Sequence, residues 1–501
     1  MILYYILILS FPLMEHPLFG REIAGFTVEK YLGMCCLAYA MIYAFHHRRP
    51  LTFLRSGTVW MFVTFYAWAV ISYCFISGPN ASHDLIRVYT AHLTFMFVVF
   101  ALVNSAERVR WSLISCVAAM GWASLYCLRE WQKGVAEYGI GYRPGYVTGD
   151  PNYFTASAIL CLQAALFFIF HRRKKWELWF ALAGLAVTIP AIIVTASRGG
   201  FIGLMAMAAF LVFRSRRPWR NGLVLAVPLA VALAILAAVP QSPVDRLLHP
   251  TASDATSANI RLQLWHAGLD MVHQHPVTGI GLGNFKPSVA KFLPPNADIE
   301  NIAHNTYMEN LAEMGVPGLL LFLAVFGAAF VSLERTRRRA RRVQADFIAQ
   351  TANSLQAGLF GFAFAIFFLS AEFLKLFWFC IFLGAALPQV LAASLEAGEV
   401  HSEPAEAAVP AMGNSAGARQ DCVPRTQGPP ARPPALPVAA EPGSAGRRSG
   451  EPNAPGKPSG AGEPHVSQAP TGTVPDDRLY DPANLTSPIN AILTAPPRRE
   501  R

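Results

Sequence analysis

Long apolar runs, each close to the length that crosses a lipid bilayer, follow one another along most of this sequence. A transmembrane helix needs about 20 mainly apolar residues, because only a helix or a closed barrel satisfies its own backbone hydrogen bonds within roughly 30 Å of hydrocarbon. We expect about twelve such helices, near residues 1–14, 27–45, 57–76, 85–103, 109–128, 151–170, 176–195, 199–213, 221–239, 315–333, 352–370 and 374–393. The first and eighth runs are short, and for the first a partial crossing is an alternative. The sequence therefore predicts an all-α, polytopic integral membrane protein.

The overall composition agrees with this fold class. Hydrophobic residues make up 53% of the chain and charged residues only 14%, which is too apolar for a water-soluble globule. The first run is a poor signal peptide, because no basic segment precedes it and no small-residue cleavage site follows. All but one of the 8 cysteines fall within the apolar runs, so no disulfide framework is expected outside the bilayer.

Clusters of Lys and Arg predict how the chain is oriented. These clusters are residues 46–49, Arg108 with Arg110, and residues 172–175, 214–220 and 335–342. If every run crosses, all of them fall on one side, which is the cytoplasmic side because basic loops are retained there. Both termini are then inside. The formal net charge of +10 is largely explained by this topology, so a nucleic-acid partner is not expected.

The same count leaves five segments on the outer face. They are residues 77–84, 129–150, 197–200 and 240–314, and the hairpin near Glu372 and Lys375. The loop at 240–314 is the only long polar segment between apolar runs, and we expect it to cover an active site. A membrane domain over residues 1–393 contains it.

Residues 394–501 differ sharply in composition from the rest of the chain. They are rich in Pro, Ala and Gly and contain almost no aromatic residues before Tyr480. Such a chain buries too little apolar surface to offset its ordering entropy. A disordered cytoplasmic tail is predicted, and partner binding through the Pro-rich stretch at 429–434 is the alternative.

Two arginines of the outer segments are candidate ligands for an anion. Arg198 lies between two apolar runs, where an arginine at membrane depth costs about 2.5 to 3.5 kcal/mol and often marks a ligand site. Arg261 lies near the start of an expected amphipathic helix in the long loop. Two planar guanidinium groups hold a diphosphate well, since each binds phosphate oxygens through paired hydrogen bonds. The alternatives are an arginine that reaches the lipid headgroups at 198 and a solvated surface arginine at 261.

His304 is the candidate general base of the outer face. It precedes Asn305 shortly before the apolar run at 315, and a neutral imidazole there could accept a proton from an attacking hydroxyl. A histidine that only forms hydrogen bonds at the interface is the alternative. The spacing of His266, His273 and His275 matches no zinc-ligand pattern, so a metal site is not expected.

Several other polar residues lie at predicted helix starts. Asp150 and Asn152 flank Pro151 before the run at 151, where capping of the first N–H groups is a sufficient explanation. Glu372 and Lys375 lie three residues apart on one helix face, so they pair with each other or Lys375 adds positive charge to an anion site. The glycine-rich turn at 279–283 lacks a preceding strand, so a dinucleotide-binding motif is not supported.

Taken together, these short motifs resemble the bacterial O-antigen ligase and O-antigen polymerase family. The motifs are the segments 149–152, 197–200, 279–285, 304–307 and 313–318. The resemblance covers roughly residues 1–393 and is strongest over 150–318. It implies a metal-independent, inverting glycosyltransferase without a cofactor, which lies in the bacterial inner membrane and carries a large periplasmic loop over an active site that faces the periplasm.

The resemblance also implies substrates and residue roles. Such enzymes move a glycan from undecaprenyl pyrophosphate to an acceptor hydroxyl, which is on a lipid A core, another repeat unit or a protein. Arg198 and Arg261 would hold the pyrophosphate, and His304 would act on the acceptor. The candidate substrate contacts beside them are Asn305, Asp150, Asn152 and Lys375. A ligase is favoured over a polymerase or a protein O-glycan ligase. A multispan transporter is the less favoured alternative, since Arg87 is the main charge expected within a span.

Overall fold

The computed structural model describes residues 1–398, apart from Ala24, residues 48–51, 78–81, 140–141 and 295–300, and all of 216–251 except Gly222 and Ala230. The expected helix at 221–239, the first part of the long loop and residues 399–501 of the predicted tail therefore lie outside the described residues. All described residues belong to one compact unit.

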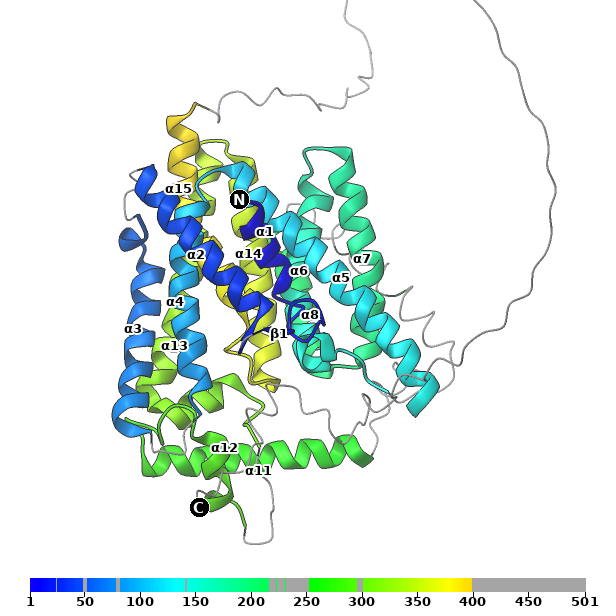
Figure 1. The fold of residues 1–501 in the computed structure, drawn as a ribbon, viewed down its shortest axis with the longest axis vertical. Helices are drawn as coiled ribbons and strands as arrows, with labels where there is room; N and C mark the ends of the chain where they lie inside the picture. The colour runs from blue at the N-terminus through cyan, green and yellow to red at the C-terminus, as the bar shows by residue number, and fades with distance from the viewer. Residues whose placement is uncertain are drawn as a thin grey trace, which may run out of the picture. The chain divides into compact units, whose positions relative to one another are not determined.

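Helices form almost all of this described part, as predicted (Figure 1). The elements are α1 (Ile2–Ser10), β1 (Glu22–Ile23), β2 (Phe26–Thr27), α2 (Val28–His46), η1 (Thr52–Arg55), α3 (Gly57–Ile71), the π-helical η2 (Ser72–Ile76), α4 (Asp84–Leu102), α5 (Ala106–Tyr138), η3 (Tyr146–Thr148), α6 (Pro151–His171), α7 (Lys175–Thr195), α8 (Arg198–Phe213), α11 (Ala252–Gln274), α12 (Phe285–Ser288), η4 (Val289–Phe292), α13 (Thr306–Arg342), α14 (Asp346–Ala365), η5 (Ile366–Phe368) and α15 (Lys375–Glu396). The two short strands pair with each other in antiparallel fashion.

The described residues contain nine helices that are long and apolar enough to cross a membrane. They correspond to the expected runs that begin near residues 27, 57, 85, 109, 151, 176, 315, 352 and 374. The run at 199 forms α8, whose 16 residues span about 24 Å. The first run forms α1, whose 9 residues are too few for a crossing. The fold is thus a multi-pass helical membrane protein.

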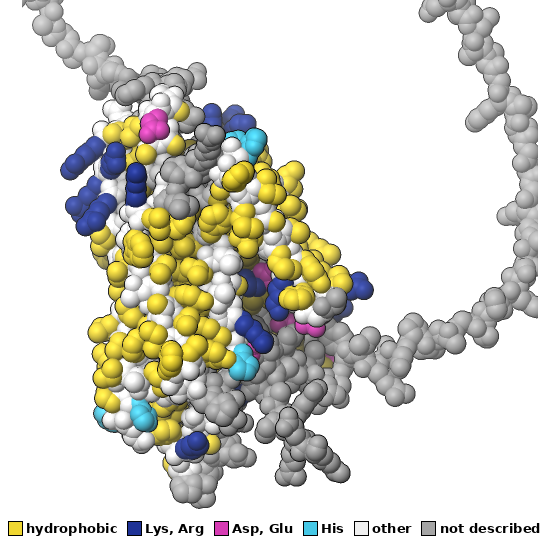
Figure 2. Space-filling view, turned by 60° about the vertical axis from the view of Figure 1, so that its left-hand side comes forward, with side chains coloured by type: hydrophobic (Ala, Val, Ile, Leu, Met, Phe, Trp, Pro, Cys, Tyr) yellow, Lys and Arg dark blue, Asp and Glu magenta, His cyan; other side chains and the backbone are white. Residues whose placement is uncertain are grey.

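Packing between the helices is centred on α6 and α15. Helix α6 packs against α5, α7, α8 and α14, and α13 packs against α3, α14 and α15. In α6 and α15, 89% and 78% of the most apolar window is buried, whereas other spans expose many apolar side chains. Figure 2 shows such side chains covering the middle of one face, with Lys and Arg side chains gathered at its upper end. This pattern suits a lipid-facing surface with polar ends.

A pair of glycines lets α8 and α14 approach each other closely. A Cβ atom on Gly203 would lie 2.6 Å from the carbonyl oxygen of Gly361, and a Cβ on Gly361 would lie 2.6 Å from the carbonyl oxygen of Gly203. Small residues at such crossings let helix backbones come into van der Waals contact in membranes. The crossing therefore positions the start of α8, which carries Arg198.

Replacing Gly203 or Gly361 with Leu should destabilise the protein, because overpacking costs about 1 to 3 kcal/mol and backbone lies in the way here. The thermal midpoint of the detergent-purified protein, followed by size-exclusion chromatography, should fall. The matched control is Gly327→Leu in α13, where a Cβ atom would meet nothing within 4 Å. An unchanged midpoint in the Gly203 and Gly361 variants would contradict a close crossing of α8 and α14.

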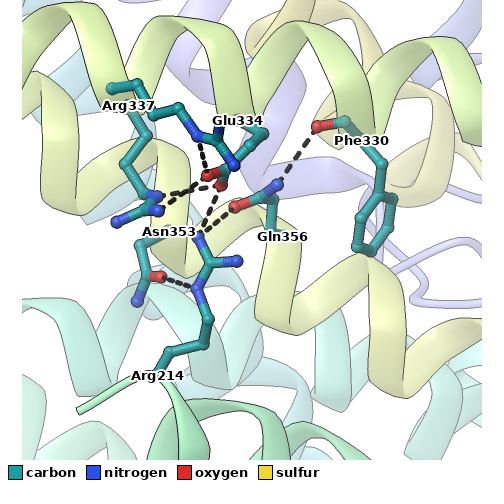
Figure 3. A network of polar contacts seen from close by, with 7 residues as sticks. Arg214, Phe330, Glu334, Arg337, Asn353 and Gln356 are labelled. Carbon is teal, nitrogen blue, oxygen red and sulfur yellow. Dashed lines mark hydrogen bonds and ion pairs between the residues drawn. The ribbon is translucent and has the colours of Figure 1, made fainter.

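A polar network joins the end of α8 to α13 and α14 (Figure 3). Arg214 donates to Glu334 at 2.6 Å and to Asn353 at 3.3 Å. Glu334 also accepts from Arg337 and Arg338, both at 2.7 Å. One carboxylate thus accepts hydrogen bonds from three guanidinium groups of the basic clusters. These contacts fix the ends of the helices whose other ends carry the candidate site.

Helix α13 is interrupted at Gly315. The φ angle there is 67°, and a Cβ atom would lie 2.3 Å from the carbonyl oxygen of Val277, so only glycine fits. The free amide of Val316 donates to the carbonyl of Pro276 at 2.9 Å. The apolar run predicted from 315 begins at this break, and residues 306–314 form a preceding helical segment on the loop side.

Candidate active site at the α11 end of the bundle

Two of the sequence motifs are joined where α6 and α8 begin. Asp150 caps α6 by accepting from the amide of Asn152 at 2.7 Å, which confirms the predicted capping. The side-chain oxygen of Asn152 accepts from the hydroxyl of Ser197 at 2.8 Å. Ser197 in turn caps α8 by accepting from the amide of Gly200. Asn152 therefore fixes the turn in which Arg198 is the first helical residue.

Arg143 ties the same two motifs together from the preceding segment. Its guanidinium donates to the carbonyl of Thr195 at 2.8 Å and to the side-chain oxygen of Asn152 at 3.3 Å. This residue was not among the candidates selected from the sequence. Its only signal was a position in the outer segment 129–150, seven residues before Asp150. A third guanidinium thus lies beside the turn that carries Arg198.

Gly199 and Gly200 serve helix packing. A Cβ atom on Gly199 would lie 2.8 Å from Cβ of Phe368, and one on Gly200 would lie 2.2 Å from Cγ2 of Thr155. Glycines of this kind also suit close approach of a ligand, and here neighbouring side chains already occupy the space that a Cβ atom would take. Their role is to let α8 start against α6 and η5.

Trp265 contacts one residue next to His304 and one residue close to the start of α8. It lies one helical turn after Arg261 on α11, and its indole N–H donates to the carbonyl of Ala303 at 2.9 Å. Its ring also meets Phe367 edge-on, with 5.5 Å between centroids. The next residue, Phe368, packs against Gly199. A chain of contacts therefore runs from the helix of Arg261, past the residue before His304, to the start of α8.

The start of α13 is anchored to the hairpin between η5 and α15. The side-chain oxygen of Asn305 accepts from the amides of Tyr307 and Met308 at 3.0 and 3.1 Å, so this side chain caps α13. The hydroxyl of Thr306 donates to the carbonyl of Leu369 at 2.7 Å and accepts from the amide of Ala371 at 2.9 Å. His304 is thereby held next to a rigid helix start.

His304 itself adopts a left-handed backbone conformation with φ of 49°. This region is uncommon for residues other than glycine, although histidine is among those enriched there. Its side chain is half-buried. Sparsely populated backbone conformations cluster at ligand and active sites, where the surrounding structure holds them. The caps and contacts on both sides of His304 provide that support.

Electrostatic interactions connect Arg198, Arg261, His304 and Asp150. Burial lowers the pKa of Arg261, Arg198 lowers it further, and Asp150 opposes both effects. Burial and the charge of Arg261 lower the pKa of His304 to about 4, again against the effect of Asp150. The imidazole is therefore neutral at pH 7. The site combines positive charge with a group that accepts a proton.

Lys375 is engaged elsewhere, in an ion pair with Glu29 of α2. Of the two alternatives for this residue, pairing with Glu372 is thus not what the structure contains. Glu372 is buried, with a side-chain oxygen that has no hydrogen-bond partner in the described part of the chain. Burial raises its pKa to about 7, although hydrogen bonds oppose the shift. No pattern in the sequence indicated that this acid is buried.

The glycine-rich turn at 279–283 packs closely against the backbone of α13 and of the segment after η2. Cβ atoms on Gly279 and Gly281 would lie 2.4 Å from the Glu313 backbone and 2.6 Å from the Ser77 backbone. The Glu313 carboxylate accepts from the amides of Gly283 and Phe285, both at 2.9 Å. These contacts hold the loop against α13 and η2. The close approach of backbone explains why glycines stand here, so no bound nucleotide is needed to explain them.

Removing the link made by Trp265 should lower activity without unfolding the protein. Trp265→Phe keeps an aromatic ring but loses the hydrogen bond to Ala303, so we expect the rate to fall by about a few fold. Trp265→Ala loses both contacts and should lower the rate about 100-fold, because misplacement of catalytic groups by about 1 Å has effects of that size. The measurement is the rate, per folded molecule, of the glycan transfer that the sequence resemblance implies. Equal rates for Trp265→Ala and wild type would contradict a positioning role.

Among the described residues, no three His, Cys, Asp or Glu side chains gather so that they could hold a metal ion. The seven described cysteines are free thiols.

Comparisons with known proteins bear on the segment that contains these residues. A family model described as O-antigen ligase matches residues 183–323, a segment that contains Arg198, Arg261 and His304. A protein named O-antigen ligase from Pseudomonas aeruginosa is 25% identical over 289 residues, which are 56% of this chain and 66% of that protein. The chain thus spans just under two thirds of the length of that relative. The family model and this relative thus agree with the resemblance to O-antigen ligases that the sequence motifs indicated, over a segment that carries the candidate site.

Proposed function

We propose that this protein is a glycosyltransferase that moves a preassembled glycan from undecaprenyl pyrophosphate to an acceptor hydroxyl. The observation that carries the proposal is the electrostatic cluster of two guanidinium groups and a neutral imidazole at one end of an apolar helical bundle. A lipid-linked donor suits this location, because its tail stays in the bilayer while its pyrophosphate reaches the polar end. Lipopolysaccharide biosynthesis is then the process served.

In the proposed reaction, His304 accepts the proton of the acceptor hydroxyl as its oxygen attacks the anomeric carbon. The bond from that carbon to the pyrophosphate oxygen breaks, the configuration inverts, and undecaprenyl pyrophosphate leaves with the electron pair. Negative charge grows on the leaving oxygens during this step. Arg198 and Arg261 face that charge, and preorganised cations lower such a barrier strongly.

Charge also accounts for how His304 would change during the cycle. In the free enzyme Arg261 disfavours the imidazolium form. A bound pyrophosphate brings negative charge next to Arg261, which offsets this effect and raises the basicity of the imidazole. The base would therefore become most effective once the donor is bound.

The remaining predicted contacts have supporting roles in this proposal. Asp150, Asn152 and Asn305 cap the helices that present the reactive groups, and Asp150 adds negative charge near His304. Arg143 adds a guanidinium beside the turn of Arg198. Lys375 stays a candidate substrate contact, with its ion pair to Glu29 as a competing role.

We place the α11 end on the periplasmic side of the inner membrane. Basic residues of the opposite end, such as Arg214, Arg337 and Arg338, support this orientation, because basic segments are retained in the cytoplasm. We favour a ligase that acts on a lipid A core. A polymerase that acts on another repeat unit and a protein O-glycan ligase remain the alternatives.

Reconstitution tests the proposed reaction. Purified protein in liposomes receives an undecaprenyl-pyrophosphate-linked glycan and lipid A core as acceptor, in the presence of EDTA. We expect a ladder of glycosylated acceptor on a gel with wild type and none with His304→Ala. Absence of the ladder with wild type in all conditions would contradict the proposed function, and a ladder that requires added metal would contradict metal independence.

A further inference from the structure

An open groove of about 660 Å³ lies along α11 and η4. The residues that matter for its chemistry are Gln263, His266, Asp270, His273, Lys291 and Phe292. We call it the α11 groove. None of its polar side chains takes part in a hydrogen bond or ion pair within the described part of the chain. Their donors and acceptors are therefore available to a ligand.

The groove and the reactive groups lie on opposite faces of one helix. Asp270 follows Arg261 by nine residues, which is about two and a half turns of an α-helix. Leu264 and Met271 lie on a third face of α11, which is buried against α12, η4 and α13. Helix α11 lies across the end of the bundle (Figure 1). It therefore separates the site of Arg261 from the groove.

The chemistry of the groove matches an oligosaccharide. Its side chains offer amide, imidazole, carboxylate and ammonium groups, which together donate and accept hydrogen bonds as hydroxyl-rich ligands require. Phe292 is half-buried in the lining, so its ring can pack against the C–H face of a sugar. The opposite charges of Asp270 and Lys291 sum to zero, which suits a ligand of low charge better than a nucleotide or a phosphate.

We propose that the α11 groove binds sugar residues of the donor glycan several units away from the bond that is broken. This inference rests on the proposed function. In the proposed complex the reacting sugar is attached to the pyrophosphate on the Arg261 side, and a long glycan that extends from there past α11 reaches the groove. Binding of remote substrate parts supplies free energy that the enzyme can use to orient the reacting centre. The groove would thus make transfer depend on glycan length.

Donor length and groove variants together test this inference. Transfer is measured with donors that carry either one repeat unit or a long glycan, using Asp270→Ala, Phe292→Ala and the double variant. We expect kcat/KM for the long donor to fall about tenfold in each single variant, which corresponds to the loss of one good contact, and kcat/KM for the short donor to stay unchanged. The matched controls are Leu262→Ala and Leu269→Ala, two exposed α11 positions outside the groove.

A binding measurement separates this inference from the proposed function. The host's own glycan, released from its carrier by mild acid, is added to the purified protein, and saturation-transfer NMR reports contact. Binding by wild type that is lost in the double variant supports the groove even if no transfer occurs. Absence of binding by wild type, or equal loss of transfer for both donor lengths, would overturn it. A dependence on the length of the acceptor glycan alone would overturn the assignment to the donor.

Discussion

Replacing His304 with Ala should lower glycan transfer by about 100- to 10,000-fold, the range that positioned general bases contribute. The physical reason is that the attacking hydroxyl then loses the neutral imidazole whose pKa is lowered by burial and by the charge of Arg261. The protein should still fold, since the caps at Asn305 and Thr306 do not involve this side chain. The measurement is the initial rate in liposomes, normalised to folded protein.

The pH profile distinguishes a base from a residue that only supports the structure. The pKa of His304 is lowered to about 4, so the neutral, active form persists until the pH falls through about that value. We expect kcat/KM, which reports the free enzyme, to decline only near pH 4. The decline in kcat should lie at higher pH, because the bound pyrophosphate favours the imidazolium form.

Two results would contradict this role for His304. One is an acid limb in kcat/KM near the ordinary histidine pKa of about 6.5 with the wild type. The other is a His304→Ala rate within a few fold of wild type. His275→Ala provides the control, since His275 is exposed in the same loop.

Replacing Arg261 or Arg198 with Ala should each lower the transfer rate by about 100- to 1,000-fold, as the loss of one preorganised donor to a developing charge does. The loss should appear mainly in kcat, because the charge on the leaving pyrophosphate increases in the transition state. Lys at either position should restore only part of the rate, since an ammonium group cannot form the paired hydrogen bonds of a guanidinium. Steady-state kinetics with a defined donor measures both effects.

Arg261 has a second expected effect, on His304. Removing its positive charge should raise the pKa of the imidazole, so the acid limb of kcat/KM in Arg261→Gln should move to higher pH than in wild type. Arg339→Ala, an exposed change at the opposite end of the bundle, should alter neither rate nor profile. Increases in KM with unchanged kcat would mean that the arginines bind donor and transition state equally, and would contradict their proposed role in stabilising the leaving group.

Most helices were predictable from the sequence, because hydropathy encodes the length of a crossing directly. The runs expected at 27–45 and 151–170 are α2 (Val28–His46) and α6 (Pro151–His171). Local capping was predictable as well, because Asp150 and the residue whose amide it caps, Asn152, are close together in the sequence. Helix α5 was underestimated: it continues to Tyr138 through residues too polar for the bilayer interior.

The parts of the site that could not be predicted depend on contacts between distant residues. Arg143 reaches Thr195, and Trp265 reaches Ala303, and neither contact follows from spacing. Lys375 forms an ion pair with Glu29, 346 positions away along the chain. The nearby acid Glu372 therefore did not predict its partner. Sequence motifs did single out Arg198, Arg261 and His304 together as candidates. They did not reveal the contacts that hold these residues near one another.

The glycan carried on undecaprenyl pyrophosphate in the host cell shows most directly whether this protein transfers glycans. It is analysed after the gene is deleted and after complementation with His304→Ala. We predict that long, finished glycan accumulates on the carrier in both strains and disappears on complementation with the wild-type gene. Accumulation of single repeat units would identify a polymerase instead of a ligase. A carrier pool that stays the same in all strains, with acceptor glycosylation intact, would contradict the assignment of glycan transfer to this protein.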